Sequence, residues 1–471
     1  MRRVTSSFLV AFALGTLGAA GWVAAQPDSA PQLPVEHPNP APAGVSPATV
    51  ERGRYLVQLG DCVACHTQKG GARFAGGRPL QTPFGTVLSA NITPDADSGI
   101  GRWNADQFYR ALHEGKSADG SHLYPAFPYN YYTHITREDS DAIYAYMRTV
   151  PPVRHDFERN RLPFPFNIRA LMAGWNWLFF DQGPVEQRSD RSASWNRGAY
   201  LVQGLGHCAA CHTPRNFLGG SKNGEAYQGG RFGELYAPDI TPNKRTGIGG
   251  WSDADLRDFL RLGANVHSDA SAEMGEVVGF STSQMTDADR DAIIAYVRSM
   301  PASADAKVSA PDAAAMKQGE AIFQDSCSAC HRMDGSGVPR LFPPLKGNAN
   351  VQQKDATSML HFILAGTRRT PNDRNPAPLS MPSYAWKLDD EQVAAVASYV
   401  RNSWGNAAEP VDAKAVGELR GKLHFDHVAG TEVSTVDAMR HPGPTTLAPA
   451  DTDSRDNGTA QAGRAAASAP R

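Results

Sequence analysis

Three absences narrow what this 471-residue chain can be. After its first residues, no stretch approaches the ~20 apolar residues that a membrane-spanning helix requires. The net charge is only −2, so nothing indicates a nucleic-acid partner and we set that class aside. No Ser-His-Asp set, P-loop or G-x-G-x-x-G stands out, so no active site of these kinds is visible. The length leaves room for about three domains.

The one long apolar run lies at the N-terminus and is typical of a secretory signal. Arg2 and Arg3 form a basic start, residues 8–20 are apolar, and the Val-Ala-Ala at residues 23–25 offers a cleavage site. We therefore expect residues 1–25 to be a signal peptide and the chain to be exported. The alternative is a retained N-terminal anchor.

Cysteine is scarce as well, and none of the six lies outside one repeated pentapeptide. Its copies are Cys62-Val63-Ala64-Cys65-His66, Cys208-Ala209-Ala210-Cys211-His212 and Cys327-Ser328-Ala329-Cys330-His331. Three disulfides, the usual use of six cysteines in an exported protein, leave the histidine after every second cysteine unexplained. A redox Cys-x-x-Cys pair explains one copy rather than three. Zinc sites need further Cys or His ligands at repeating positions, and none repeats.

Covalent heme attachment explains every feature of the pentapeptide. Two thiols spaced three apart on one helical turn can each add to a heme vinyl group, and the adjacent histidine is then delivered beneath the iron. The sequence therefore predicts three covalently bound hemes c. The predicted attachment residues are Cys62, Cys65, Cys208, Cys211, Cys327 and Cys330, and the predicted proximal iron ligands are His66, His212 and His331.

The surroundings of the motifs repeat and predict three similar domains. A short apolar helix with a glycine precedes each motif, at Gly53, Gly198 and Gly319. Glycine inside a helix costs roughly 1 kcal/mol against alanine, so its repeated use indicates close contact with a second helix. Acidic first turns and apolar residues at helical spacing predict these second helices. Their expected ranges are residues 137–150, 287–300 and 389–404.

Two helices that cross at a glycine, with a heme between them and a loop, resemble the class I cytochrome c fold. We therefore expect a mainly α protein with three tandem class I cytochrome c domains. The predicted organisation is a signal peptide at 1–25, a first domain at 47–150, an aromatic-rich connector at 151–192, a second domain at 193–300, a linker at 301–312, a third domain at 313–405 and a polar, disordered tail at 406–471.

The first two domains share two further motifs, which indicates that they are duplicated modules. The pairs are Asn91-Ile92-Thr93-Pro94 with Asp239-Ile240-Thr241-Pro242, and Gly99-Ile100-Gly101-Arg102-Trp103 with Gly247-Ile248-Gly249-Gly250-Trp251. The two tryptophans either cover a heme edge or bind a heme propionate, or they are core residues.

The connector between the first two domains is unusual because it mixes arginines with aromatic residues. The aromatic residues are Phe164, Phe166, Trp175, Trp177, Phe179 and Phe180. The segment cannot span a bilayer. We expect it either to lie on a membrane surface or a partner subunit, or to clamp two domains of this chain together.

On the distal side, electron-transfer hemes of this type usually bind a methionine. Met381, in a Ser-Met-Pro sequence ahead of the last helix, is the predicted ligand in the third domain. In the second domain Met274 is favoured over Met285, which directly precedes a helix. The equivalent position in the first domain is Phe127, which cannot bind iron. Either another residue such as His134 binds there, or that heme is five-coordinate.

Three heme motifs in this order resemble the cytochrome c subunits of membrane-bound dehydrogenases from acetic acid bacteria and related proteobacteria. The stretches that carry the resemblance are Tyr124-Pro125-Ala126-Phe127-Pro128-Tyr129, Leu162-Pro163-Phe164-Pro165-Phe166-Asn167-Ile168-Arg169 and Gly206-His207-Cys208-Ala209-Ala210-Cys211-His212-Thr213-Pro214-Arg215-Asn216. It covers about residues 47–405. Many proteins of this kind carry methionine where this chain has Phe127. The distal ligand that the resemblance implies for the first heme is therefore missing at this position.

The resemblance implies an electron-transfer subunit without its own substrate-oxidising site, at the periplasmic face of the cytoplasmic membrane. The implied partners are ubiquinone and a large catalytic dehydrogenase subunit of the molybdenum, quinoprotein or flavoprotein type. The variant with Phe127 resembles those paired with molybdenum-type aldehyde or heteroaromatic dehydrogenases. The alternatives are a free periplasmic carrier to a terminal oxidase, and a peroxidase-like heme enzyme with an open site on the first heme.

Overall fold

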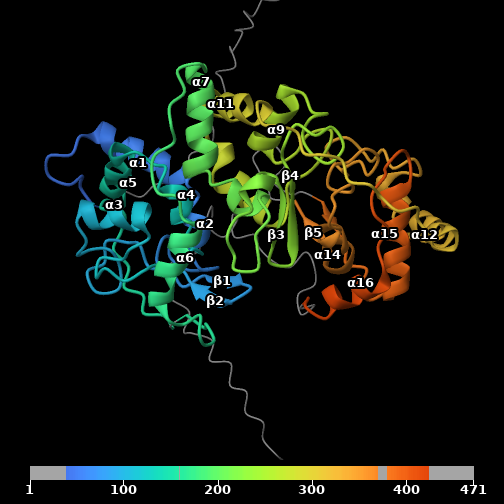
Figure 1. Cartoon of the computed structure of the whole chain (residues 1–471), viewed down its shortest axis with the longest axis horizontal. Coiled ribbons are helices and arrows are strands. Elements are labelled where there is room, and N and C mark those ends of the chain that lie inside the picture. The colour runs from blue at the N-terminus through green and yellow to red at the C-terminus, as the bar shows by residue number, and fades with distance from the viewer. Residues whose placement is uncertain (1–38, 159, 370–378, 424–471) are drawn as a thin grey trace, which may run out of the picture.

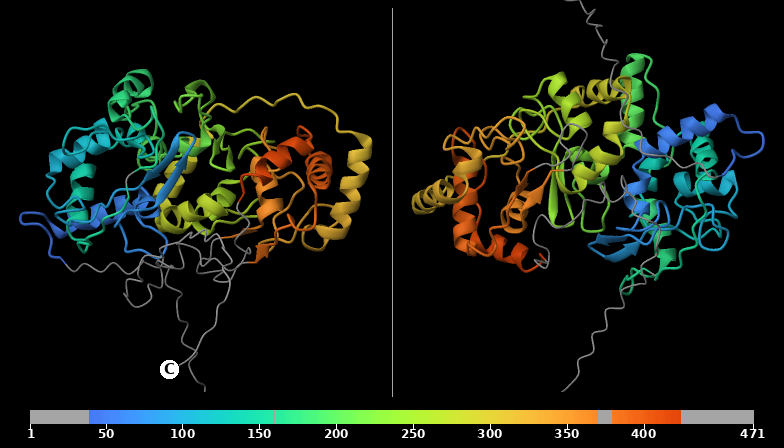
Figure 2. Two further views of the ribbon diagram at one scale, coloured as in Figure 1. Left: turned by 90° about the horizontal axis from the view of Figure 1, so that it is seen from below. Right: turned by 180° about the vertical axis from the view of Figure 1, so that it is seen from behind.

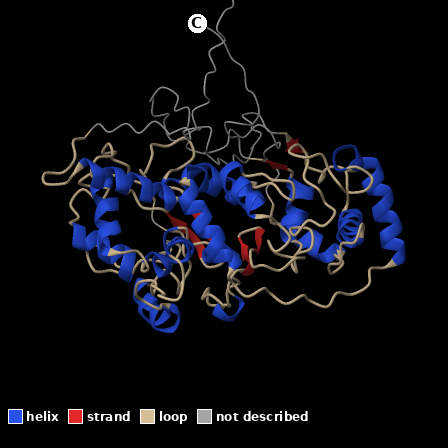
Figure 3. Ribbon diagram, turned by 90° about the horizontal axis from the view of Figure 1, so that it is seen from above, coloured by secondary structure: helices blue, strands red, loops and turns tan. Residues whose placement is uncertain are grey.

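Each domain starts with a helix that leads into a cysteine motif and ends with a helix that packs across it. In the computed structural model, which describes residues 39–158, 160–369 and 379–423, three such units lie in a row (Figure 1). The helix pairs are α1 (Pro47–Leu59) with α5 (Arg137–Met147), α7 (Ala193–Tyr200) with α11 (Asp287–Arg298), and α12 (Ala313–Ser326) with α15 (Asp390–Asn402). The prediction of a mainly α fold is confirmed, as Figure 3 shows.

The second helices of the first two pairs start where the sequence predicted, and that of the third pair starts one residue later. All three end two or three residues before the predicted end. Side chains of Thr136, Thr286 and Asp389 cap the three starts by accepting a backbone N–H. Two of the ends lie just ahead of Pro151 and Pro301, and residues before proline avoid the helical conformation.

The predicted close contacts at the three glycines are confirmed. A Cβ atom on Gly53 would lie 1.9 Å from the Ala142 carbonyl oxygen, and one on Gly198 would lie 1.9 Å from that of Ala292. On Gly319 it would lie 2.2 Å from the carbonyl oxygen of Ala395. Any side chain here would therefore push the two helices apart.

The other elements fill the space between these pairs. The motif helices are α2 (Cys62–His66), α8 (Ala209–His212) and α13 (Ser328–His331). The remaining helices are α3 (Ala105–Glu114), α4 (Tyr129–Tyr132), α6 (Met172–Phe179), α9 (Asp253–Leu262), α10 (Ala272–Phe280), α14 (Thr357–Ala365) and α16 (Ala413–Arg420), with short turns η1 (Arg169–Leu171), η2 (Leu201–Leu205), η3 (Asn223–Glu225) and η4 (Thr282–Gln284). Three antiparallel hairpins are β1 (Pro79–Thr82) with β2 (Gly85–Leu88), β3 (Gln228–Phe232) with β4 (Leu235–Asp239), and β5 (Thr367–Arg368) with β6 (Ser380–Met381).

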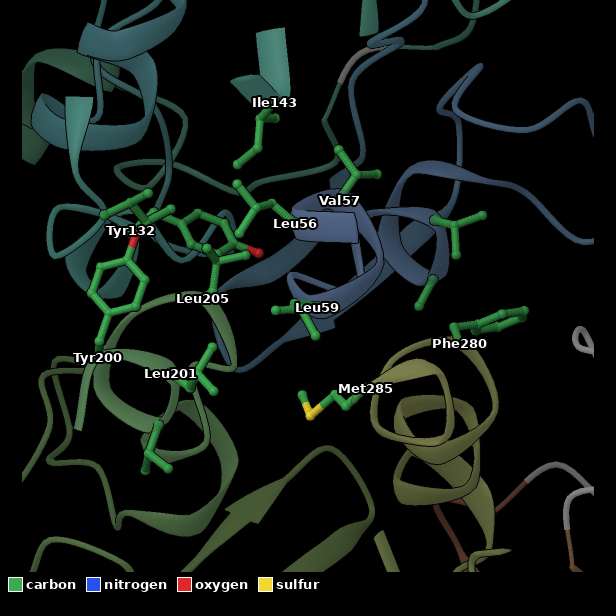
Figure 4. Packing of buried hydrophobic residues seen from close by; sticks show 14 of the residues in the cluster. Leu56, Val57, Leu59, Tyr132, Ile143, Tyr200, Leu201, Leu205, Phe280 and Met285 are labelled. Carbon is green, nitrogen blue, oxygen red and sulfur yellow. The ribbon is translucent and has the colours of Figure 1, made fainter. Parts of the chain in front are cut away.

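The first two domains share one hydrophobic core, whereas the third has its own. Figure 4 shows side chains of both domains meeting in the shared core, with Leu59, Leu205 and Met285 grouped near its centre. Leu59, Leu205 and Met285 are all buried. The first two domains are therefore one packing unit.

A reciprocal pair of hydrogen bonds also joins these two domains. Tyr55 in α1 donates to Asp289 in α11 at 2.7 Å, and Tyr200 in α7 donates to Asp139 in α5 at 2.5 Å. Each carboxylate also binds an arginine of its own domain; for Asp289 this is Arg197 at 2.8 Å. Although burial opposes it, the hydrogen bonds from Arg197 and Tyr55 hold the pKa of Asp289 below its usual value.

The third domain meets the second through polar contacts. Arg369 pairs with the largely buried Asp269, Arg231 pairs with Asp355 at 2.9 Å, and the Asn348 amide donates to the His267 carbonyl at 3.0 Å. Residues 301–312 have no regular helix or strand and arch between the two domains in the left view of Figure 2.

The predicted disordered tail from residue 406 onward is wrong for residues 406–423. Helix α16 lies there, with Val416 and Leu419 buried in the core of the third domain. Arg420 bonds to Asp390 of α15 at 2.7 Å. Two apolar residues three positions apart are enough to dock one helical face. The predicted signal peptide at 1–25 and the rest of the tail lie outside the described residues.

The connector does clamp the first two domains together. Tyr129 donates to Asn176 of α6 at 2.6 Å, while Trp175 of α6 donates to the Leu218 carbonyl of the second domain at 3.0 Å. None of the helices within the described ranges combines the length and apolar character of a membrane span.

We expect Gly319→Ala to lower the free energy of unfolding of the third domain by about 2 kcal/mol or more, because the new methyl group meets backbone. Hydrogen–deuterium exchange of α12 and α15 measures the loss as faster local opening. Gly174→Ala in α6 is the matched control, because a Cβ there meets nothing within 4 Å. The control should slow exchange in α6 slightly. Equal, small effects of both substitutions would contradict the close contact.

We expect Tyr55→Phe and Tyr200→Phe each to destabilise the contact between the first two domains by about 1–3 kcal/mol, because a buried carboxylate loses a donor. The measurement is the midpoint of the thermal transition that these two domains share. Tyr236→Phe is the control, since its hydroxyl donates within one domain, to the Gln228 carbonyl at 3.3 Å. If all three variants melt alike, the reciprocal bonds do not stabilise the interface.

Candidate heme-attachment sites

Each cysteine motif folds into a short helix, so its two cysteines lie one turn apart. In the described chain all six thiols are free of disulfide bonds. Burial raises the pKa of Cys62, Cys65 and Cys208 to about 12, and that of Cys211 and Cys327 to about 11. Two thiols spaced in this way are what two thioether bonds to one heme require.

The histidine of each motif has one ring nitrogen fixed by a backbone carbonyl. The Nδ1–O distances are 2.7 Å from His66 to Ala90, 2.6 Å from His212 to Pro238 and 3.0 Å from His331 to Pro343. Burial lowers the pKa of all three imidazoles, which favours the neutral form. A neutral ring that donates from Nδ1 keeps the Nε2 lone pair for a metal, the arrangement expected of an oriented iron ligand.

These carbonyl acceptors were not predicted from the sequence, although a signal for two of them was present. Ala90 and Pro238 directly precede the repeated Asn/Asp-Ile-Thr-Pro motif. In this motif the Asn91 side chain accepts from the Thr93 N–H at 2.9 Å, and Asp239 accepts from the Thr241 N–H at 2.7 Å. The repeat therefore fixes the turn that presents the carbonyl to the histidine.

A partly buried cation next to the first motif fits a heme. The Nε atom of Arg73 is buried and has no hydrogen-bond partner, and its guanidinium lies 5.5 Å from the ring of Phe74. Phe74 is tied to Thr67, the residue after His66, by a 3.1 Å hydrogen bond. A buried N–H group without a hydrogen-bond partner is costly. The carboxylates of a heme would satisfy it.

The residues at the three distal positions considered lie in a loop in the first domain, in a helix in the second and in a strand in the third. Phe127 faces His66 edge to face, with ring centroids 6.4 Å apart. Met274 is partly buried near the start of α10, whereas Met285 is buried in the shared core. Met381 pairs with Thr367 in the β5–β6 hairpin and packs against the core of the third domain.

The remaining candidate residues, one histidine and two tryptophans, contact other protein groups. His134 places Nδ1 2.6 Å from the carbonyl oxygen of Gly183, a connector residue. Trp251 stacks on His267 at 5.4 Å, and Trp103 packs partly buried against the shared core.

One arginine links the first motif to the distal helix of the second domain. Arg78 donates to the Ala64 carbonyl inside the first motif and pairs with Glu276 of α10 at 2.9 Å. The same helix carries Met274. The Arg78 contacts at the first candidate site therefore help to position Met274 at the second.

Comparison with known proteins agrees with this geometry. The sequence profile described as "Cytochrome c" matches residues 50–151, 196–301 and 316–404. The chain is 39% identical over 395 residues to the gluconate 2-dehydrogenase cytochrome c subunit of Pantoea cypripedii, which covers 79% of this chain and 90% of that protein. It is 37% identical over 413 residues to the fructose dehydrogenase cytochrome subunit of Gluconobacter japonicus, covering 81% and 84%.

A third relative is a subunit of the nicotinate dehydrogenase of Pseudomonas putida, 41% identical over 374 residues. That alignment covers 77% of this chain but 31% of the longer relative. The chain thus belongs to the cytochrome c family, whose members bind heme c. Within it, the chain belongs with the cytochrome c subunits of dehydrogenase complexes, as its motifs predicted.

Proposed function

We propose that this chain binds three hemes c and carries electrons from a catalytic dehydrogenase subunit to ubiquinone at the periplasmic face of the cytoplasmic membrane. Bound heme supplies one-electron exchange between ferrous and ferric iron. The observation that carries the proposal is the threefold recurrence of two cysteines one turn apart with a histidine whose Nδ1 meets a carbonyl.

The proposed roles of the residues follow from this arrangement. Cys62, Cys65, Cys208, Cys211, Cys327 and Cys330 hold the porphyrins; His66, His212 and His331 ligate iron on the proximal side; Met274 and Met381 ligate it on the distal side. The carbonyl acceptors fix the imidazole orientation. The shared core and the Arg78 contacts hold the first two sites at a fixed separation.

The proposed dehydrogenase partner is supported by the names of the relatives, which are cytochrome subunits of gluconate, fructose and alcohol dehydrogenases. The likeness to a nicotinate dehydrogenase subunit, together with Phe127, favours a molybdenum-type catalytic subunit for a heteroaromatic or aldehyde substrate.

An apolar patch formed by the connector and the adjacent loop of the second domain supports attachment to a membrane surface. Its exposed members, which together form the connector patch, are Phe164, Leu171, Trp177, Leu178, Phe217 and Leu218. Phe164 is 79% exposed, Trp177 85% and Phe217 88%. Contiguous exposed apolar side chains mark surfaces that contact a membrane or another protein. Figure 1 shows α6, which carries Trp177, beside the β1–β2 hairpin.

The charge around the connector patch suits a bilayer with anionic headgroups. Residues 162–180 and 214–222 contain Arg169, Arg215 and Lys222 but no carboxylate. The segments lie together, since the Phe84 ring is 4.9 Å from that of Phe166 and also meets Gly219. Exposed aromatics with flanking cations are typical of surfaces that rest in a membrane interface.

Ethanol, acetaldehyde, gluconate and nicotinate are added separately to native membranes. We expect one of them to reduce the hemes, which the absorbance of the heme α-band measures. Deletion of the gene should stop ubiquinone reduction by that substrate. A variant with His331→Ala should retain substrate oxidation with an artificial acceptor but lose quinone reduction. Reduction by dithionite alone would contradict the dehydrogenase assignment for these substrates and favour a free carrier.

We expect the combined substitution Phe164→Ser, Trp177→Ser and Phe217→Ser to release the protein from membranes. Each aromatic contributes about 1.5 kcal/mol or more of apolar burial, so the partition coefficient should fall at least tenfold per residue. Flotation with vesicles that contain anionic phospholipid measures it. Trp386→Ser is the control, because Trp386 is 82% exposed on the third domain. Unchanged flotation with loss of the catalytic subunit on purification would assign the patch to that subunit instead.

A further inference from the structure

In the first domain, the position opposite the proximal histidine is occupied by a phenylalanine ring, which consists of carbon and has no atom that can bind a metal. The rings of Phe127 and His66 meet edge to face with centroids 6.4 Å apart. Phe127 follows His66 by 61 residues (127 − 66), and Met274 follows His212 by 62 (274 − 212). The duplicated chain thus has phenylalanine where the second domain has its candidate sulfur ligand.

Polar side chains near Phe127 already have partners elsewhere. The hydrogen bonds are Tyr129 to Asn176 at 2.6 Å, Tyr131 with Ser221 at 3.1 Å, Tyr132 to the Gly60 carbonyl at 3.0 Å and His134 with the Gly183 carbonyl at 2.6 Å. The Tyr132 ring packs on Phe127 at 5.5 Å, so its carbon face and not its hydroxyl borders the site. Each of these four side chains would have to break a bond to reach a metal.

Of three remaining donors in the first domain, one packs in the core and two are histidines with an unpartnered ring nitrogen. Met147 is 1% exposed within α5 and belongs to the shared core. His113 is buried and stacks on Tyr109 at 3.9 Å, although its Nε2 has no hydrogen-bond partner. His122 also has one unpartnered ring nitrogen, Nδ1. These two histidines are therefore the competitors that an experiment must exclude.

We propose that the first heme site leaves one iron position without a protein ligand and binds a small uncharged molecule there, such as carbon monoxide or nitric oxide. The walls formed by Phe127 and Tyr132 are apolar, and an anion would lose its hydration without compensation. A peroxide would need a hydrogen-bond donor for its activation, and distal polarity decides between such functions. The site is thus a ligand-binding site rather than a peroxidase site.

This inference rests on heme attachment at the first motif and not on the proposed partner or quinone. The test is a titration of the dithionite-reduced, full-length holoprotein with carbon monoxide, followed by its absorbance difference spectrum. The heme count comes from the pyridine hemochrome spectrum. We expect one carbon monoxide per three hemes in the native protein, none in Phe127→Met and again one in Phe127→Leu. The ferric native protein should show a high-spin signal from one heme in three, which Phe127→Met converts to low spin.

The variants separate this proposal from its rivals. Phe127→Leu controls for volume, because leucine is smaller but still offers only carbon. A native protein that binds no carbon monoxide, and gains one site on His113→Ala or His122→Ala, would assign the iron to that histidine and overturn the proposal. Binding that persists in Phe127→Met would overturn it too. If the double substitution Cys62→Ser and Cys65→Ser leaves the heme count unchanged, the three-heme proposal fails together with this one, and the heme count identifies that failure.

Discussion

The close approach of two helices at a glycine is the constraint on which each domain depends. At Gly53, Gly198 and Gly319 the partner helix presents a backbone carbonyl, which cannot move aside as a side chain can. This contact fixes the distance between the helix that delivers the cysteine motif and the helix that closes the domain. The motif histidines then meet their carbonyl acceptors at 2.6–3.0 Å in all three domains.

The three domains are nevertheless joined unequally. The first two share a core and exchange hydrogen bonds from Tyr55 and Tyr200 to buried carboxylates, so they cannot separate without exposing apolar surface. The third has its own core and meets the second through ion pairs and side-chain amides. Such polar interfaces resemble those between separable domains. The chain therefore combines a rigid two-site unit with a third site of greater independence.

Spacing within the sequence predicted those parts of the structure that local rules determine. The helices at Arg137 and Asp287 follow from acidic first turns and apolar periodicity, and the glycine contacts follow from repetition. The reciprocal bonds of Tyr55 and Tyr200 could not be predicted. Both tyrosines lie in the repeated helix ahead of the cysteine motif, and nothing in that repeat indicates a contact with another domain. Helix α16 was not predicted for a different reason: two apolar residues do not give a recognisable helical pattern in a polar, alanine-rich segment.

The loop around Phe127 shows how the fold can keep its shape when a candidate metal ligand is replaced. In the third domain the segment with Met381 is held by a two-residue strand pair, a weak support that a bond to iron would strengthen. In the first domain the corresponding loop is held by hydrogen bonds between three tyrosines and the connector, the second domain and the Gly60 carbonyl. Two of these partners belong to the connector and to the second domain, which the shared core, the reciprocal hydrogen bonds and the connector contacts hold against the first domain. The same contacts that make the two domains one unit therefore free the first site from needing a distal ligand for its structure.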